Sequence, residues 1–435
     1  MHPLLIIFCL TIFAIVTWRN LALGLAILFS LLPTYLIRFH WGPLPTTFLE
    51  ILVWIVSIIW FIQKIKTVGW RGIIREKINY IKKWPLLALS ISLFLLGATI
   101  NVFLAVDIRA ALGEWRAFYV EPIIISYILV TTVKTKKEIH TILFGLMLCG
   151  LITSILAIYQ HFTGWLVPHA FWANRNTYRV TAWYGFPNGV GLFLAPLLPL
   201  LIYSGSSLVK KINHKRAKVL FVICYLLSFI CYLLAIVYAK STGAIIGLFG
   251  GLGLYFLLNK KTRVATIVIA IIGIFGIIVT PNSNSLKQEI LAQDYSGKLR
   301  RDIWSETITY LKLHPLRGTG MASYEEEIVP FRYNKKIEVF HHPHNIFLTV
   351  WVNTGLVGLL GFVGILLWFF VTAIRDFKNT ESKSLSYTLL IAMCVWLVMS
   401  LVDSPYIKND LALLFWLVVG LMGSTRMSGA LYDDF

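Results

Sequence analysis

A short polar sequence, HHPHN at positions 341–345, runs directly into a long apolar stretch that begins at Ile346. This order predicts that His342, His344 and Asn345 lie at the external mouth of a membrane helix, where polar side chains are candidates for function. A neutral histidine could take a proton from an attacking hydroxyl there, because its reference pKa is about 6.5. Histidines that only hydrogen-bond to loop backbone are the alternative, and spacing alone leaves both open.

The same stretch is a weak candidate for a metal site. No Asp, Glu or Cys follows the histidines at a ligand-like spacing, and Pro343 restricts the local backbone. The acidic run 325–327 is interpreted as a solvated surface, with a divalent-cation site as the weaker alternative. The five cysteines lie in apolar stretches without a CxxC spacing, which predicts neither a disulfide framework nor a zinc site. We therefore expect no metal and no cofactor.

Cationic residues form a second group that could do chemistry. Arg179 precedes the sequence GFPN, which ends at Asn188 where an apolar span begins. Free N–H groups at a helix start, together with a guanidinium fork, favour phosphate oxygens. Lys240 and Ser241 stand in a tight turn between two other spans. An arginine that merely reaches lipid headgroups is the alternative interpretation of Arg179.

Two further helices are predicted to carry arginines. Apolar residues repeat at helical spacing over 298–313, which indicates an amphipathic helix on the membrane bundle, and this helix bears Arg300 and Arg301. Nearer the N-terminus, Arg109 and Arg116 are seven residues apart and share one helical face. Guanidinium groups can stabilise the negative charge that develops on a leaving phosphate.

The scaffold that must position these residues is apolar. Of the 435 residues, 58% are hydrophobic and 14% charged, whereas soluble domains carry about 45–50% apolar and about 25% charged residues. A soluble globular protein and a disordered chain are therefore excluded. Apolar stretches recur along the whole chain, which predicts an all-α polytopic membrane protein with about 12 transmembrane helices, 12 or 13 by count. Residues 1–435 then form a single integral membrane domain.

The net charge of +19 would suggest nucleic acid in a soluble protein, but topology explains much of it here. Twenty-three Lys and Arg residues lie on one set of connections, which includes the basic segment 64–84, and this excess predicts the cytoplasmic side. The opposite side holds the long loop 281–345 with the histidines and the amphipathic helix. We expect a lipid bilayer as a partner and no nucleic acid.

At these residues the chain resembles the O-antigen ligase and O-antigen polymerase superfamily. The resemblance begins at Arg179, and the earlier spans match only in character. Four motifs carry it, in this order along the chain: RVTAWYGFPN (179–188), STGAIIGL (241–248), RDIWSETITYLKLHPLRGTGMASY (301–324) and HPHNIFLTVWVNTGLVGLLGF (342–362).

The resemblance implies a GT-C-like glycosyltransferase of the bacterial cytoplasmic (inner) membrane with its active site on the periplasmic or external side. Such enzymes move a glycan from undecaprenyl pyrophosphate to a hydroxyl on lipid A-core or another acceptor, with inversion and usually without metal. By motif position, His344 is similar to the essential histidine, and Arg179 and Arg301 are similar to the arginines that hold the pyrophosphate. The other expected substrate contacts are Arg116, Asn188, Lys240, Ser241, Arg300, His342 and Asn345.

One departure from the family pattern concerns the cation expected next to Ser241. An arginine often follows the serine of the second motif in the family, whereas Thr242 follows Ser241 here. Lys240, on the other side of that serine, is the expected substitute.

Several other functions remain open. A repeat-unit polymerase of the same superfamily is the nearest alternative, and the motifs barely separate it from a ligase. A protein-directed oligosaccharyltransferase is another, as is a glycosyltransferase with Asp107 or Glu114 as the base. A lipid-linked glycan flippase or transporter would place charges inside its spans, whereas nearly all charges here are predicted in loops.

Overall fold

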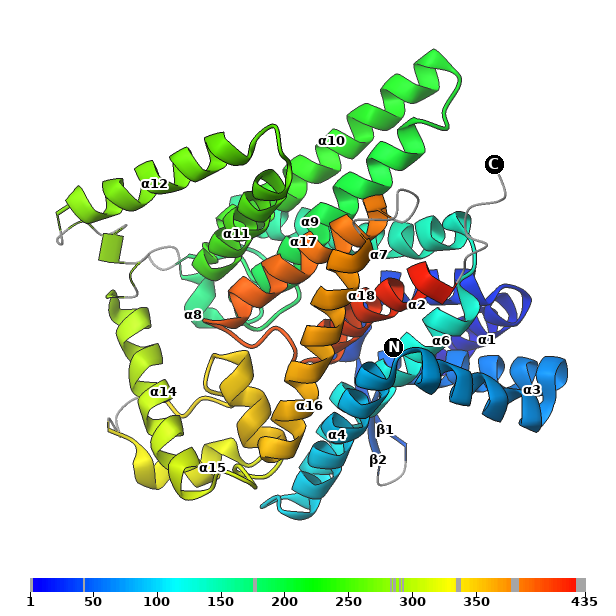
Figure 1. Cartoon of the computed structure of the whole chain (residues 1–435), viewed down its shortest axis with the longest axis horizontal. Helices are drawn as coiled ribbons and strands as arrows, with labels where there is room; N and C mark the ends of the chain where they lie inside the picture. The colour runs from blue at the N-terminus through cyan, green and yellow to red at the C-terminus, as the bar shows by residue number, and fades with distance from the viewer. Residues whose placement is uncertain are drawn as a thin grey trace.

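The computed structural model describes residues 3–41, 44–174, 178–281, 284, 287–288, 291, 293–333, 338–376 and 383–427. Nearly all regular structure in these residues is helical, as predicted (Figure 1). The α-helices are α1 (Pro3–Arg19), α2 (Leu21–Ser30), α3 (Phe48–Lys83), α4 (Pro85–Phe103), α5 (Ile108–Glu114), α6 (Glu121–Thr132), α7 (Lys136–Thr163), α8 (Ala170–Ala173), α9 (Asn188–Val209), α10 (Lys215–Tyr238), α11 (Thr242–Leu258), α12 (Arg263–Val279), α14 (Tyr295–Leu313), α15 (Tyr324–Ile328), α16 (Ile346–Asp376), α17 (Lys383–Ser400) and α18 (Asn409–Met427).

Six of these helices are long and apolar enough to cross a membrane: α3, α4, α7, α9, α10 and α16. Six more, α1, α2, α11, α12, α17 and α18, are apolar but shorter. A polytopic, nearly all-α membrane protein is therefore confirmed, while the total of 12 or 13 spans stays a prediction. Helix α12 buries none of its described residues and extends away from the other helices (Figure 1), as a lipid-facing helix would.

One short sheet departs from the all-helical expectation. Helix α2 stops at Ser30, and Pro33 lies in the first turn of a 3₁₀ helix over Leu32–Leu36. A proline lacks the N–H that a continuing α-helix needs. The chain then forms the antiparallel pair β1 (Arg38–Trp41) and β2 (Leu44–Thr47).

The closest helix pair is α4 with α16, and small residues let their backbones touch. A Cβ placed on Gly97 of α4 would lie 2.6 Å from both the Gly358 Cα and the Thr354 carbonyl oxygen of α16. One turn further along α16, a Cβ on Gly361 would lie 2.6 Å from the Ser90 carbonyl oxygen. Membrane helices associate through this kind of packing, because lipid tails are as apolar as their side chains.

The loop that follows α14 packs against a kink in α16. Gly355 has a φ of 64°, a left-handed conformation that interrupts the helix and that glycine adopts without steric cost. Next to it, the Leu356 N–H donates to the Leu316 carbonyl at 3.1 Å, and the Thr319 N–H donates to the Val352 carbonyl at 2.9 Å. The loop after α14 is thus fastened to α16, and α14 and α15 lie beside this half of the helix (Figure 1).

We predict that Gly97→Ala destabilises the protein. The added methyl group must push α4 and α16 apart, and such overpacking costs about 1–3 kcal/mol. The measurement is the thermal unfolding midpoint in detergent. Gly253→Ala is the matched control, because a Cβ at this α11 glycine meets nothing within 4 Å, so this variant should unfold at the wild-type temperature or slightly above. Equal midpoints for the two variants would contradict the packing account.

Candidate active site

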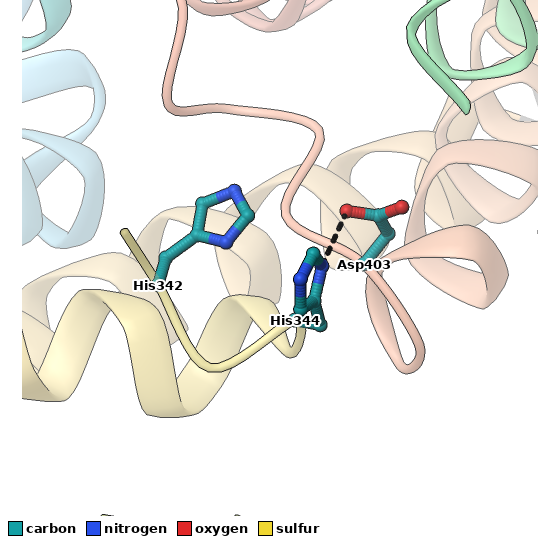
Figure 2. A group of neighbouring side chains, drawn as sticks. All are labelled: His342, His344 and Asp403. Atoms are coloured by element: carbon teal, nitrogen blue, oxygen red, sulfur yellow. Dashed lines mark hydrogen bonds and ion pairs between the residues drawn. The ribbon is translucent and has the colours of Figure 1, made fainter. Parts of the chain in front are cut away.

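His344 faces a carboxylate that lies 59 residues away in the chain. Its Nδ1 is 3.3 Å from Oδ1 of Asp403, in the connection between α17 and α18. Asp403 is only 5% exposed, and its Oδ1 also accepts the Ser404 N–H at 2.9 Å. Figure 2 shows the His344 ring next to this carboxylate, with His342 beside it on the same segment. An ionised carboxylate accepts only, so Nδ1 of His344 carries the proton and Nε2 is left as a base.

The second oxygen of Asp403 joins the His344–Asp403 pair to Asn188 and Arg179, two of the expected substrate contacts. Asn188, at the start of α9, donates from Nδ2 to Oδ2 of Asp403 at 3.0 Å. Its Oδ1 in turn accepts Nη2 of Arg179 at 2.9 Å. A continuous hydrogen-bonded chain therefore runs from Arg179 through Asn188 and Asp403 to His344. We call these four residues the polar network.

Arg179 also holds the turn between α10 and α11. Its Nε donates to the Ala239 carbonyl and its Nη2 to the Lys240 carbonyl, both at 2.8 Å. Lys240 is exposed, whereas Ser241 is 2% exposed and packs on α9, where a Cβ on Gly191 would come 2.5 Å from the Ser241 Oγ. The structure thus brings the Lys240 backbone to the network and uses Ser241 in helix packing.

His344 is held in an unusual backbone conformation. Its φ is 50°, in the left-handed region, which a residue with a Cβ rarely occupies. The following residue stabilises this geometry, because the Asn345 side chain accepts the N–H groups of Phe347 and Leu348 and so caps the start of α16. Asn345 also donates to the Leu401 carbonyl at 3.0 Å, which fastens the histidine segment to the chain leading to Asp403.

Two pKa values follow from burial and mutual charge. Burial alone would raise the pKa of Asp403, but the hydrogen bonds that it accepts from His344 and from the Ser404 N–H, together with the neighbouring imidazoles of His344 and His342, outweigh burial and hold this pKa well below its usual range. Burial lowers the pKa of His342 to about 4, and the neighbouring His344 imidazole adds to this effect. At neutral pH, Asp403 is therefore ionised and His342 is neutral.

Helix α14 is tethered directly to the histidine segment. Trp304 donates its indole N–H to the Pro343 carbonyl at 2.8 Å. Arg300 and Arg301 lie four and three residues before Trp304, so both fall on neighbouring positions of that helix. Arg301 is exposed, and Arg300 donates from Nη1 to the Ser296 Oγ at 2.9 Å. The bond from Trp304 to Pro343 therefore keeps Arg300 and Arg301, two expected substrate contacts, about one helical turn from the histidine segment.

Arg116 occupies a different cluster. Its Nη2 lies 2.7 Å from Oε2 of Glu50 and its Nε lies 3.5 Å from Oε1 of Glu121, and both carboxylates are buried. Trp54 donates to the same oxygen of Glu121 at 2.8 Å. The structure therefore uses Arg116 to neutralise two buried carboxylates of α3 and α6, and a phosphate contact for it stays a prediction.

The histidines and Asp403 could in principle hold a metal ion. One ligand atom each from His342, His344 and Asp403 lie within 4.8 Å of one another. Both Asp403 oxygens, however, already accept hydrogen bonds from Asn188, His344 and Ser404. Ligation would have to break this arrangement, so the donor set fits a histidine–carboxylate pair better than a metal centre.

The sequence analysis does not single out Asp403, although a signal for it exists. An ionisable residue directly after a long apolar stretch is itself a sign of function. In the structure α17 ends at Ser400, so Asp403 lies in the following connection. Lys408 in the same connection was also missed. Its Nζ lies 4.6 Å from the centre of the Phe186 ring in the GFPN motif, and burial lowers its pKa.

The fold and the site together define a multi-pass membrane protein with a histidine–carboxylate pair and several cations at one end of its helices. In comparison with known proteins, residues 227–363 match the family model described as O-Antigen ligase, which is less than half of the chain. This match confirms the predicted resemblance to the O-antigen ligase superfamily. It includes Lys240, Arg301 and His344, whereas Arg179 and Asp403 lie outside it.

Two curated relatives match more distantly. A Haemophilus influenzae protein named "Uncharacterized protein" is 27% identical over 185 residues, which is 36% of this chain and 46% of that protein. A Rickettsia conorii protein named "Putative polysaccharide ligase" is 27% identical over 175 residues, which is 37% of this chain and 42% of that protein. The matched regions thus span less than half the length of either relative.

We predict that Asp403→Asn lowers the turnover number about 100-fold or more and changes substrate KM little. The variant keeps the side-chain shape but removes the charge that orients and polarises His344. Glycan transfer by purified protein is the measurement. Asp376→Asn is the control, since Asp376 is also buried, accepts a hydrogen bond from Ser386 at 3.0 Å, and lies at the other end of α16. A similar loss of turnover in both variants would mean that Asp403 is only structural.

Proposed function

We propose that the protein is an O-antigen ligase-type glycosyltransferase. It would transfer a glycan from undecaprenyl pyrophosphate to a hydroxyl of lipid A-core or a comparable surface acceptor, outside the cytoplasmic membrane and with inversion. The observation that carries this proposal is the polar network, which links His344, the proposed base, by hydrogen bonds to Asn188 and Arg179, two proposed substrate contacts. The family match supports a polysaccharide ligase or polymerase type of function.

In the proposed reaction, the acceptor hydroxyl loses its proton to Nε2 of His344. The hydroxyl oxygen forms a bond to the anomeric carbon of the donor glycan, and the bond from this carbon to the pyrophosphate oxygen breaks. The electron pair leaves with undecaprenyl pyrophosphate. Asp403 stabilises the imidazolium that forms on His344, as a buried carboxylate does in other histidine bases.

The cations around the network would receive the leaving pyrophosphate. Arg179 lies within the network, Lys240 lies in the turn that Arg179 holds, and Arg301 stands on the tethered helix α14. Lys408 adds a cation beside the GFPN motif. Asp403 is shielded by its hydrogen bonds, so the local balance of charge is positive and favours a pyrophosphate whose negative charge increases as the bond to the sugar breaks. The proposed mechanism uses no metal.

Replacing the base should abolish transfer without unfolding the protein. We predict that His344→Ala lowers the transfer rate by a factor of about 10² to 10⁴, the usual contribution of a general base. His341→Ala is the matched control, because His341 is an exposed histidine of the same segment that pairs with Glu325. The assay measures glycosidic bond formation by protein in lipid nanodiscs. Wild-type transfer by His344→Ala would exclude His344 as the base.

Deletion of the gene in its host should separate a ligase from a repeat-unit polymerase. A ligase joins finished chains to the acceptor, so its loss should leave undecaprenyl-linked polymer intact and remove all attached polymer. A polymerase lengthens chains, so its loss should leave single repeat units attached. Gel analysis of surface glycans distinguishes the two patterns, and we expect the first. The second pattern would replace our proposal with the polymerase.

A further inference from the structure

A small open cavity lies between α14 and residues of the following segment, among them Tyr324, Ile328, Arg332 and 338–340. Part of the wall is apolar, formed by residues such as Ile303, Ile328 and Phe340. The mixed lining suits a sugar ring better than a lipid chain.

The rest of the wall is charged. Asp302, Glu306, Arg332 and Glu338 line it. Glu306 is 7% exposed, and its Oε1 accepts the Tyr333 N–H at 2.6 Å, which fixes this carboxylate against the cavity. The carboxylates of Asp302 and Glu338 are exposed and make no hydrogen bond or ion pair to any residue that the structure describes.

This lining selects among possible ligands by charge. Three carboxylates and one guanidinium leave an excess of negative charge, which disfavours phosphates and acidic sugars. Carboxylates accept hydrogen bonds from hydroxyl groups, and a guanidinium donates to hydroxyl or ring oxygens. The apolar wall can cover the C–H face of the same ligand. An uncharged, hydroxyl-rich sugar ring satisfies both parts of the lining.

The cavity also adjoins the polar network. Phe340 lines it and makes an edge contact with His344, with 5.1 Å between ring centres. Asp302 follows Arg301 in α14, the helix that Trp304 ties to Pro343. A sugar bound in the cavity would therefore be separated from the proposed base by a single aromatic side chain.

We propose that this cavity is a glycan subsite, which binds one uncharged pyranose ring of a substrate glycan next to the reacting one. The proposal rests on the proposed glycosyltransferase function and adds a specificity site to it. The ring can belong to the lipid-linked donor glycan or to the acceptor glycan, since both present the same hydroxyl chemistry. The Asp302 and Glu338 carboxylates select the ring through its hydroxyl groups.

The test is the double variant Asp302→Asn/Glu338→Gln of the full-length protein in lipid nanodiscs. Both side chains are exposed, so the variant should fold. The KM of the donor, the KM of the acceptor and kcat are measured separately. Loss of two charge-assisted hydrogen bonds should raise the KM of one glycan substrate about tenfold or more, with kcat nearly unchanged. Glu326→Gln, an exposed carboxylate that does not line the cavity, is the control and should match wild type.

Each outcome has one meaning. A higher donor KM assigns the ring to the donor glycan, and a higher acceptor KM assigns it to the acceptor. Unchanged KM values for both, or a loss confined to kcat, would overturn the subsite while wild-type transfer still supports the proposed function. If EDTA reproduces the KM change in wild type, the carboxylates bind a cation, and the subsite is also overturned. No transfer by wild type would refute the proposed function, and the subsite with it.

Discussion

A buried carboxylate between α17 and α18 holds the functional end of this protein together. Asp403 is 5% exposed, and an ionised group removed from water is costly unless hydrogen bonds replace its hydration. Its partners come from its own connection, from the start of α9 through Asn188 and from the segment before α16 through His344. Asn188 extends the arrangement to Arg179, and Arg179 extends it to the turn between α10 and α11.

Backbone strain lies at the same place. His344 and Lys240 have φ values of 50° and 48°, in the left-handed region where a residue with a Cβ is disfavoured. Such conformations cost about 1–3 kcal/mol each and persist where the surroundings determine them. Asn345 and Arg179 supply those surroundings, through bonds to the start of α16 and to the Lys240 carbonyl. The bonds of Asn345 thus hold the strained segment in place, with the His344 ring toward Asp403.

The two arginine clusters show how partners decide what a cation can do. Arg116 lies between the buried carboxylates Glu50 and Glu121, which fixes α3 and α6 but uses its charge within the protein. Arg179 instead donates to the side-chain oxygen of Asn188 and to two backbone carbonyls, and its guanidinium lies 5.4 Å from the centre of the Trp172 ring. These bonds join the start of α9 to the turn between α10 and α11, and the proposed pyrophosphate site includes Arg179 because of this place in the polar network.

Composition and periodicity alone determined the membrane class, the helical fold and the helix over 298–313, because apolar stretches and helical spacing are local properties of a chain. Motif order further indicated the ligase-type family and His344. Only the tertiary structure decided that Asp403 faces His344, that Arg116 is paired internally, and that α14 leaves a cavity beside Phe340. These are contacts between segments far apart in the chain. They depend on how the helices pack and on which residues pair with buried charges, and the local spacing of residues in the sequence determines neither.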